Sequence, residues 1–146
     1  MKTLKLITLS LLLSITFFSC NSDDDNPSIE PTTKERLAHK WFLLKVLNVE
    51  TGEETIADSC EQNSYYEFSI TGDFSLGFFA LNTGTCELNS SESGTYEMME
   101  YEGDEGFLIT LPDGSTEGSK IVSISETELI LEQTGFGTRH ITFIKE

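Results

Sequence analysis

Two cysteines, Cys60 and Cys86, offer the clearest chemistry in the sequence. Two strand-like runs lie between them around Thr71-Gly72-Asp73, so folding that hairpin brings both cysteines to its open end. Closing this loop with a disulfide would stabilise the fold by roughly 3.5 kcal/mol in the chain-entropy model. Free thiols or a metal site are the alternatives, but no histidine lies near either cysteine, and two ligands alone do not make a structural zinc site. We therefore expect a disulfide, and no metal or cofactor.

No catalytic arrangement is visible in the sequence. It has two histidines, His39 and His140, and it lacks the Gly-x-Ser-x-Gly, His-Glu-x-x-His, phosphate-loop and Cys-His patterns. Carboxylate pairs are plentiful at this composition, so they carry almost no information about glycosidase-type chemistry. We expect that the protein is not an enzyme.

The charge balance is strongly acidic, with 25 Asp and Glu against 9 Lys and Arg, which gives a net charge of −16. Nucleic-acid binding needs clustered basic side chains, so this balance argues against it, and also against adhesion to anionic lipid. The same charge would steer the protein toward a basic protein partner. The densest acidic stretch is Glu100–Glu105, for which solubility, edge protection or weak Ca²⁺ binding are the alternative roles.

The N-terminal residues have the form of a targeting signal. Two lysines precede the apolar run Leu6–Phe18, which is too short for a good transmembrane span, so residues 1–19 are expected to be a secretory signal peptide. The end of this run resembles a bacterial lipobox, in which Cys20 would receive diacylglycerol, although Phe17 stands where Leu is usual. A plain signal peptide with an incidental cysteine is the alternative. The resemblance implies an outer-membrane lipoprotein with a membrane anchor, either surface-exposed or facing the periplasm.

Residues 20–32 are polar and contain proline, and they are expected to form a disordered tether behind the lipid. The acidic cluster Asp23–Asp25 directly after Cys20 resembles the surface-export signal of Bacteroidota lipoproteins. A solvated spacer and a Ca²⁺ site are the other interpretations.

The remaining chain, residues 33–146, is interpreted as one domain of strands after a short helix. Thr32-Thr33-Lys34-Glu35 has the spacing of a capping box, which predicts a helix to about Ala38. From there the hydrophobic period is two, and the connections carry turn residues and leave no room for crossover helices, so neighbouring strands should be antiparallel. The eight predicted strands are Lys40–Val49, Tyr65–Ile70, Phe74–Ala80, Gly94–Tyr101, Gly106–Leu111, Ser119–Ser125, Glu128–Gln133 and Thr138–Lys145.

The alternation in these strands defines one apolar face. Ser123 and Thr142 are among the residues expected on the opposite, solvent face. Because the strands follow one another as hairpins, we predict an all-β fold, an eight-stranded antiparallel up-and-down barrel, in preference to a sandwich. The residues expected to point inward are Phe68, Ile70, Phe74, Leu76, Phe78, Tyr96, Met98, Phe107, Ile109, Leu111, Val122, Ile124, Leu129, Leu131, Ile141 and Phe143.

The segment Leu37-Ala38-His39-Lys40-Trp41 resembles the opening motif of lipocalin-like domains, in which Gly-x-Trp follows a short helix. His39 stands where that motif has Gly. Over about residues 37–146 the chain is similar to the lipocalin-like lipoproteins of Bacteroidota. Three features carry this similarity: Cys60 precedes Tyr66-x-Phe68 and a Gly-Asp turn, Cys86 precedes Gly94-Thr95-Tyr96, and the chain ends on Ile141-Thr142-Phe143.

The resemblance implies that Trp41 plugs one end of a barrel whose interior binds a small apolar or amphipathic molecule. A filled core without a ligand is the alternative, in which the protein would act through a basic protein partner. Lipocalins often place a basic residue over the Trp, but Arg139 begins the last strand and Trp41 the first, so antiparallel pairing puts them at opposite ends. The candidate ligand-lining residues are Tyr66, Phe68, Leu76, Phe78, Tyr96, Met98, Ile109 and Leu131.

Overall fold

A computed structural model of the protein describes residues 30–101, 103–135 and 137–145. The predicted signal peptide, the lipidated Cys20 and the Asp23–Asp25 cluster lie outside the described residues. The elements are α1 (Thr33–Leu37), β1 (Lys40–Asn48), β2 (Glu54–Ile56), the 3-10 turn η1 (Glu61–Asn63), β3 (Tyr65–Phe68), β4 (Asp73–Asn82), β5 (Thr85–Tyr101), β6 (Asp104–Thr110), β7 (Thr116–Ile124), β8 (Glu128–Gln133) and β9 (Arg139–Lys145).

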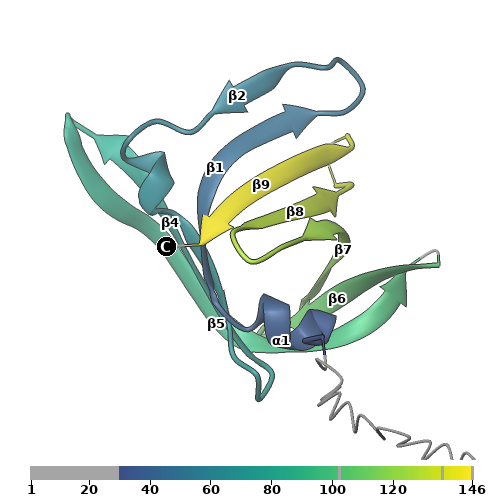
Figure 1. Cartoon of the computed structure of the whole chain (residues 1–146). Helices are drawn as coiled ribbons and strands as arrows, with labels where there is room; N and C mark the ends of the chain where they lie inside the picture. Colours follow the sequence, from purple (N-terminus) through teal and green to yellow (C-terminus); the bar gives the residue numbers. More distant parts are fainter. Residues whose placement is uncertain (1–29, 102, 136, 146) are drawn as a thin grey trace, which may run out of the picture.

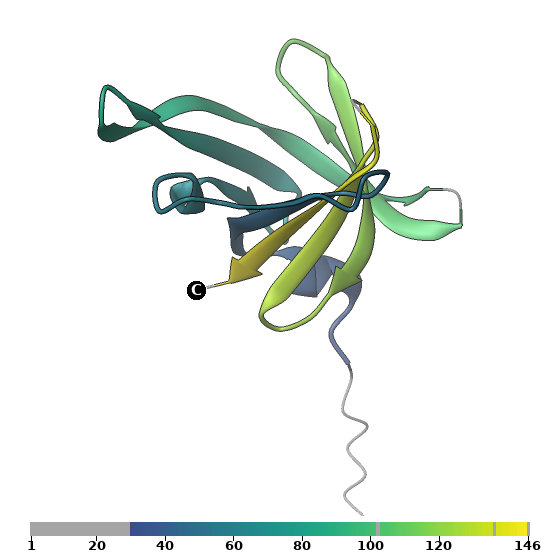
Figure 2. The ribbon, with the colours of Figure 1, turned by 90° about the horizontal axis from the view of Figure 1, so that it is seen from above.

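Eight of the strands close into an antiparallel barrel, which confirms the predicted fold (Figures 1 and 2). β1 and then β3 to β9 pair in chain order, and β9 returns to pair with the other edge of β1, from Trp41–Lys145 at one end to Asn48–Arg139 at the other. We call the end that carries Trp41 and α1 the closed end, and the end that carries Asn48 and Arg139 the open end. Trp41 and Arg139 therefore lie at opposite ends, as predicted.

One edge of β1 is shared between two partners. Near the closed end, Lys40–Phe42 pair with β3, and nearer the open end Lys45–Leu47 pair with β2, a short ninth strand that the sequence did not predict. All three residues of β2 are exposed, so no alternation of burial marks it. Since β3 reaches only the first part of β1, the wall beside the open end is formed by β2 and by the segment that leads into η1.

The barrel core is packed with aromatic rings toward the closed end. Tyr66 lies 4.9 Å from Phe143 and 5.4 Å from Phe74 between ring centroids, and Phe68 lies 5.0 Å from both Tyr96 and Phe107. Leu37, Trp41, Leu129 and Leu131 are fully buried in the same cluster. Most of the predicted inner face therefore forms one continuous core.

Three residues predicted to point inward are exposed. Ile70 is 53% exposed because β3 ends at Phe68 and Ile70 lies in the turn that follows. Phe78 is 41% exposed because it pairs with Ser90, in the part of the β4–β5 hairpin that extends beyond the β5–β6 pairing. This hairpin projects from the barrel in Figure 2.

An irregular pairing between β7 and β8 explains the exposure of Val122, the third of these residues, and cross-strand neighbours explain one further difference, at Thr142. Val122 is 41% exposed and Ile121 takes the inner position, since the β7–β8 register shifts between Ile121 and Ser123. Thr142, expected to face water, is buried on the outer face between its cross-strand neighbours Lys45 and Ile130, which flank it with long side chains.

Candidate functional site

The predicted ligand-lining residues are mostly packed against one another. Tyr66, Phe68, Leu76, Tyr96, Ile109 and Leu131 are all buried in the core cluster, and Met98 is partly buried against it, while Phe78 is exposed. The structure thus brings seven of the eight together, as the filling of the barrel. The pockets described below, at the open end, have other linings.

Trp41 closes the barrel end opposite those pockets. Its indole is fully buried, and its Nε1–H donates to the carbonyl oxygen of Leu37 at 2.9 Å. Leu37 belongs to α1, which begins with the predicted capping box, because the Thr32 side chain accepts from the Glu35 backbone N–H and the Glu35 carboxylate accepts from the Thr32 N–H. The short helix is therefore fixed across the closed end, and Trp41 lies beneath it.

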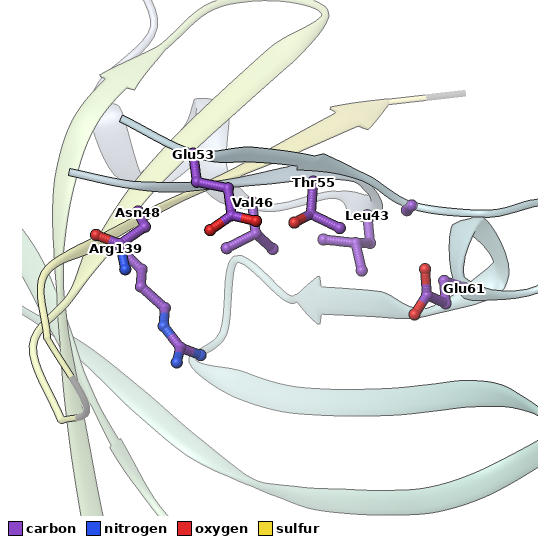
Figure 3. A pocket seen from close by; sticks show the side chains of 8 residues that line it. Leu43, Val46, Asn48, Glu53, Thr55, Glu61 and Arg139 are labelled. Carbon is purple, nitrogen blue, oxygen red and sulfur yellow. The ribbon is translucent and has the colours of Figure 1, made fainter. Parts of the chain in front are cut away.

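A pocket of about 370 Å³ lies at the open end, along the inner side of β1 and β2 (Figure 3). Leu43 and Val46 of β1 give it an apolar wall, which Ala57, just after β2, extends. The polar lining residues are Asn48, Glu53, Thr55, Glu61 and Arg139. The pocket therefore combines an apolar surface with charged side chains of both signs.

Arg139 also borders a second depression of about 530 Å³, between β7 and the β8–β9 turn. The lining of this depression is otherwise neutral or acidic, with Glu117 and Gln133 as its larger polar side chains. Within the part of the chain that the structure describes, the Arg139 side chain has no hydrogen bond, ion pair or ring contact. Its guanidinium is thus available to solvent and to a ligand from both depressions.

A polar network joins the open end to the aromatic core. Gln133 Nε2 lies 3.4 Å from the Tyr66 hydroxyl and 3.2 Å from Glu117 Oε1, and can donate to both oxygens. Burial, and then the nearby Glu117 carboxylate, raise the pKa of Tyr66 to about 12, so its hydroxyl stays protonated at neutral pH. Tyr66 consequently marks the level at which the filled core gives way to the polar open end.

The predicted disulfide between Cys60 and Cys86 is confirmed. Cys60 directly precedes η1, and Cys86 lies in β5, opposite Leu81. The bond therefore ties η1, which carries the pocket residue Glu61, to the projecting β4–β5 hairpin. Asn63 fixes the segment around η1, since its Nδ2 donates to the carbonyl oxygens of Ser59 and Cys60 at 3.1 Å, and it lies 3.7 Å from Cys86 Sγ across the junction.

In the described ranges, no group of three or more His, Cys, Asp or Glu side chains is arranged to hold a metal ion. No helix in the same ranges is long and apolar enough to cross a membrane.

The pocket lining was missed by the sequence interpretation because it comes from β2, from η1, from the open-end parts of β1 and β9, and from Leu43, in a stretch of β1 that is apolar at every position and shows no period of two. Register alone could have found part of it. The antiparallel pairing of the first and last strands places Asn48 opposite Arg139, and Val46 opposite Ile141, on the inner face of the wall.

Comparisons with known proteins agree with the barrel fold. Similar solved structures include a lipocalin-like protein from Bacteroides uniformis (TM-score 0.52, 24% identity, covering 76% of this chain and 99% of that one) and an uncharacterized protein from Bacteroides eggerthii (TM-score 0.51, 18% identity, 75% and 99%). A bovine lipocalin allergen is more distant, with a TM-score of 0.42, 15% identity, and coverage of 79% and 75%. No curated protein matches the chain. The profile of the lipocalin-like domain matches residues 37–131, and the chain therefore belongs to the lipocalin-like domain family.

Proposed function

We propose that the protein binds a small amphipathic molecule at the open end of its barrel. The observation that carries this proposal is the pocket beside β1 and β2, where Leu43 and Val46 lie next to Arg139 and Asn48. Its volume of about 370 Å³ falls toward the lower end of the range of about 300–1,000 Å³ that small-molecule sites occupy. Small-molecule sites are usually lined mainly by apolar side chains, and this pocket is more polar, with three apolar and five polar lining residues, as suits an amphipathic ligand.

The binding site proposed here differs in position from the one that the sequence suggested. The deep interior is occupied by Tyr66, Phe68, Phe107 and Leu131, so a ligand there would have to displace packed side chains at a cost of several kcal/mol. At the open end a ligand can contact Leu43 and Val46 without such a rearrangement.

A neutral lipophilic dye tests this proposal. N-phenylnaphthylamine should bind to the wild-type protein with increased fluorescence. Val46→Phe, which adds volume inside the pocket, should reduce binding at least about tenfold, as expected for a blocked apolar site. Val122→Phe makes the same change on the outer surface of β7 and should leave binding unaltered. Equal dye binding by all three proteins would place the dye elsewhere and refute this site.

The chain is further proposed to be a cell-envelope lipoprotein without catalytic activity. Support comes from the lipobox-like sequence at Cys20, the apolar run before it and the acidic cluster after it. Cys20→Ser should abolish labelling by a palmitate analogue and release the protein from the membrane fraction. Replacing Asp23–Asp25 with Ala should reduce protease access on whole cells if the cluster is an export signal, and unchanged access would contradict that role.

A basic protein partner is the second candidate, supported by the charge of −16 and by the β5–β6 turn. Exposed Glu100, Asp104 and Glu105 lie there beside Met98 and Met99, around a depression of about 370 Å³. Asp104 already pairs with Lys120 at 2.6 Å. Binding to lysozyme, used as a basic probe, should fall with salt and with Glu100→Gln, whereas salt-independent binding would argue against this candidate.

A further inference from the structure

Among the described residues, Arg139 is the basic side chain that lines the two depressions at the open end. We infer that Arg139 holds the anionic head group of an amphipathic ligand, a carboxylate, whose apolar part lies against Leu43 and Val46. This inference rests on the proposed function and adds to it the charge and the direction of the bound molecule.

Arg139 differs from every other basic residue of the described ranges, which hold seven Lys and Arg in all. Four of the others lie within 4 Å of a carboxylate: Arg36, Lys40, Lys45 and Lys120. Lys34 lies over an aromatic ring, and Lys145 contacts a histidine. In a chain with 25 acidic residues, an arginine without such a contact is the exception.

The position of Arg139 directs its side chain to the pocket. Its backbone pairs with Asn48 on β1, and the same register places Val46 opposite Ile141. Figure 3 shows the Arg139 side chain near Asn48, with Val46 and then Leu43 further along β1 and Glu61 at the far end. A ligand whose head lies at Arg139 would therefore extend over an apolar surface.

The shape of the guanidinium suits a carboxylate or a phosphate, and a carboxylate, which carries less negative charge, is repelled less by the Glu53 and Glu61 side chains of the pocket. The planar fork of guanidinium N–H donors matches the two oxygens of a carboxylate, and such contacts are about twice as strong as neutral hydrogen bonds. Glu53 and Glu61 also line the pocket, and both would repel a carboxylate placed beside them. Glu61, at the far end of the pocket from Arg139, disfavours the reverse orientation, whereas Glu53 lies near Asn48 at the Arg139 end.

Decanoate and decanol provide a matched pair of probes, since they share an apolar chain and differ in charge. Displacement of N-phenylnaphthylamine from the wild-type protein should show decanoate binding about tenfold more tightly than decanol at low salt. Arg139→Gln should remove that advantage, and leave decanol unchanged. Arg139→Lys should retain part of it, because the charge remains and the fork is lost. Arg36→Gln, which removes the same charge near the closed end, should behave as wild type.

Failure of the inference can be told apart from failure of the proposed function. If the dye binds in a Val46-dependent manner and both probes displace it equally with or without Arg139, the pocket stands and its preference for an anion is refuted. If the dye binding does not depend on Val46, the site itself is refuted and the inference falls with it. Equal losses in Arg139→Gln and Arg36→Gln would assign the effect to overall charge and would also overturn the inference.

Discussion

Replacing Trp41 with Phe tests how the closed end contributes to stability. The indole is fully buried and donates one hydrogen bond to the Leu37 carbonyl oxygen at 2.9 Å. Replacing the indole with a phenyl ring removes about 40 Å² of buried apolar surface, which lowers the free energy of unfolding by about 1 kcal/mol. The space left behind, about 40 Å³, costs about 1 kcal/mol more. The Leu37 carbonyl oxygen still accepts a hydrogen bond from the His39 N–H at 2.6 Å. The lost hydrogen bond from the indole therefore costs only about 1 kcal/mol.

The free energy of unfolding should therefore fall by about 3 kcal/mol. Urea unfolding should be followed by circular dichroism, because Trp41 is the only tryptophan and fluorescence would vanish with it. The midpoint should drop by about 2 M for a slope of about 1.5 kcal/mol/M. Leu81→Ala, at a site 60% exposed, is the control and should change the free energy by less than about 0.5 kcal/mol. A loss below about 1 kcal/mol in Trp41→Phe would refute the role of the indole as a plug.

Three further changes test other parts of the fold. Replacing Cys60 and Cys86 together with Ala should lower the free energy of unfolding by roughly 3.5 kcal/mol, measured against oxidised wild type, and an unchanged value would refute the contribution of the disulfide. The folded-state pKa of Tyr66, about 12, exceeds its ordinary value of 10.0, so its contribution to stability is complete below pH 10 and is lost as pH rises through 12. In a tyrosinate absorbance titration, Tyr66→Phe should remove the phase near pH 12, and its persistence would contradict that assignment. Gly106→Ala places a Cβ 2.6 Å from the Ser119 carbonyl oxygen and should destabilise the fold by about 2 kcal/mol in thermal unfolding. Gly118→Ala, with 3.8 Å to its nearest neighbour, should be nearly neutral, and equal effects would contradict the steric explanation.

Much of the barrel could be predicted because one face of most strands is buried. Leu129 and Leu131 occupy alternate positions in β8, between Glu128 and Glu132, and the bounds of this strand were predicted as observed. Tyr66 and Phe68 on β3 show the same period. Burial on one face imposes a period of two on the sequence, and that period is what a reader of the sequence detects.

The parts of the fold that were not predicted lack this period of two. Residues 85–93 of β5 are exposed on both faces, and Leu88 is the one large apolar side chain among them, so the strand was predicted to begin only at Gly94. The irregular pairing after Ile121 changes which side chain points inward without any change in composition. Arg139 was identifiable as lying opposite Asn48, but its lack of a partner depends on where seven basic side chains settle in three dimensions. Such a property belongs to the folded chain and to no local pattern.

The bond between Cys60 and Cys86 has a consequence for when the binding site becomes complete. Barrel closure depends on backbone pairing between β1 and β9, which needs no oxidant. The position of η1, and of Glu61 with it, depends in addition on a covalent link to a different part of the sheet. A chain folded where thiols are kept reduced would thus have its strands assembled and this wall of the site held without its covalent link, by hydrogen bonds such as that from the Leu43 N–H to the Ser64 carbonyl oxygen at 2.9 Å. Oxidation would finish the site after the barrel has formed, which separates maturation from folding.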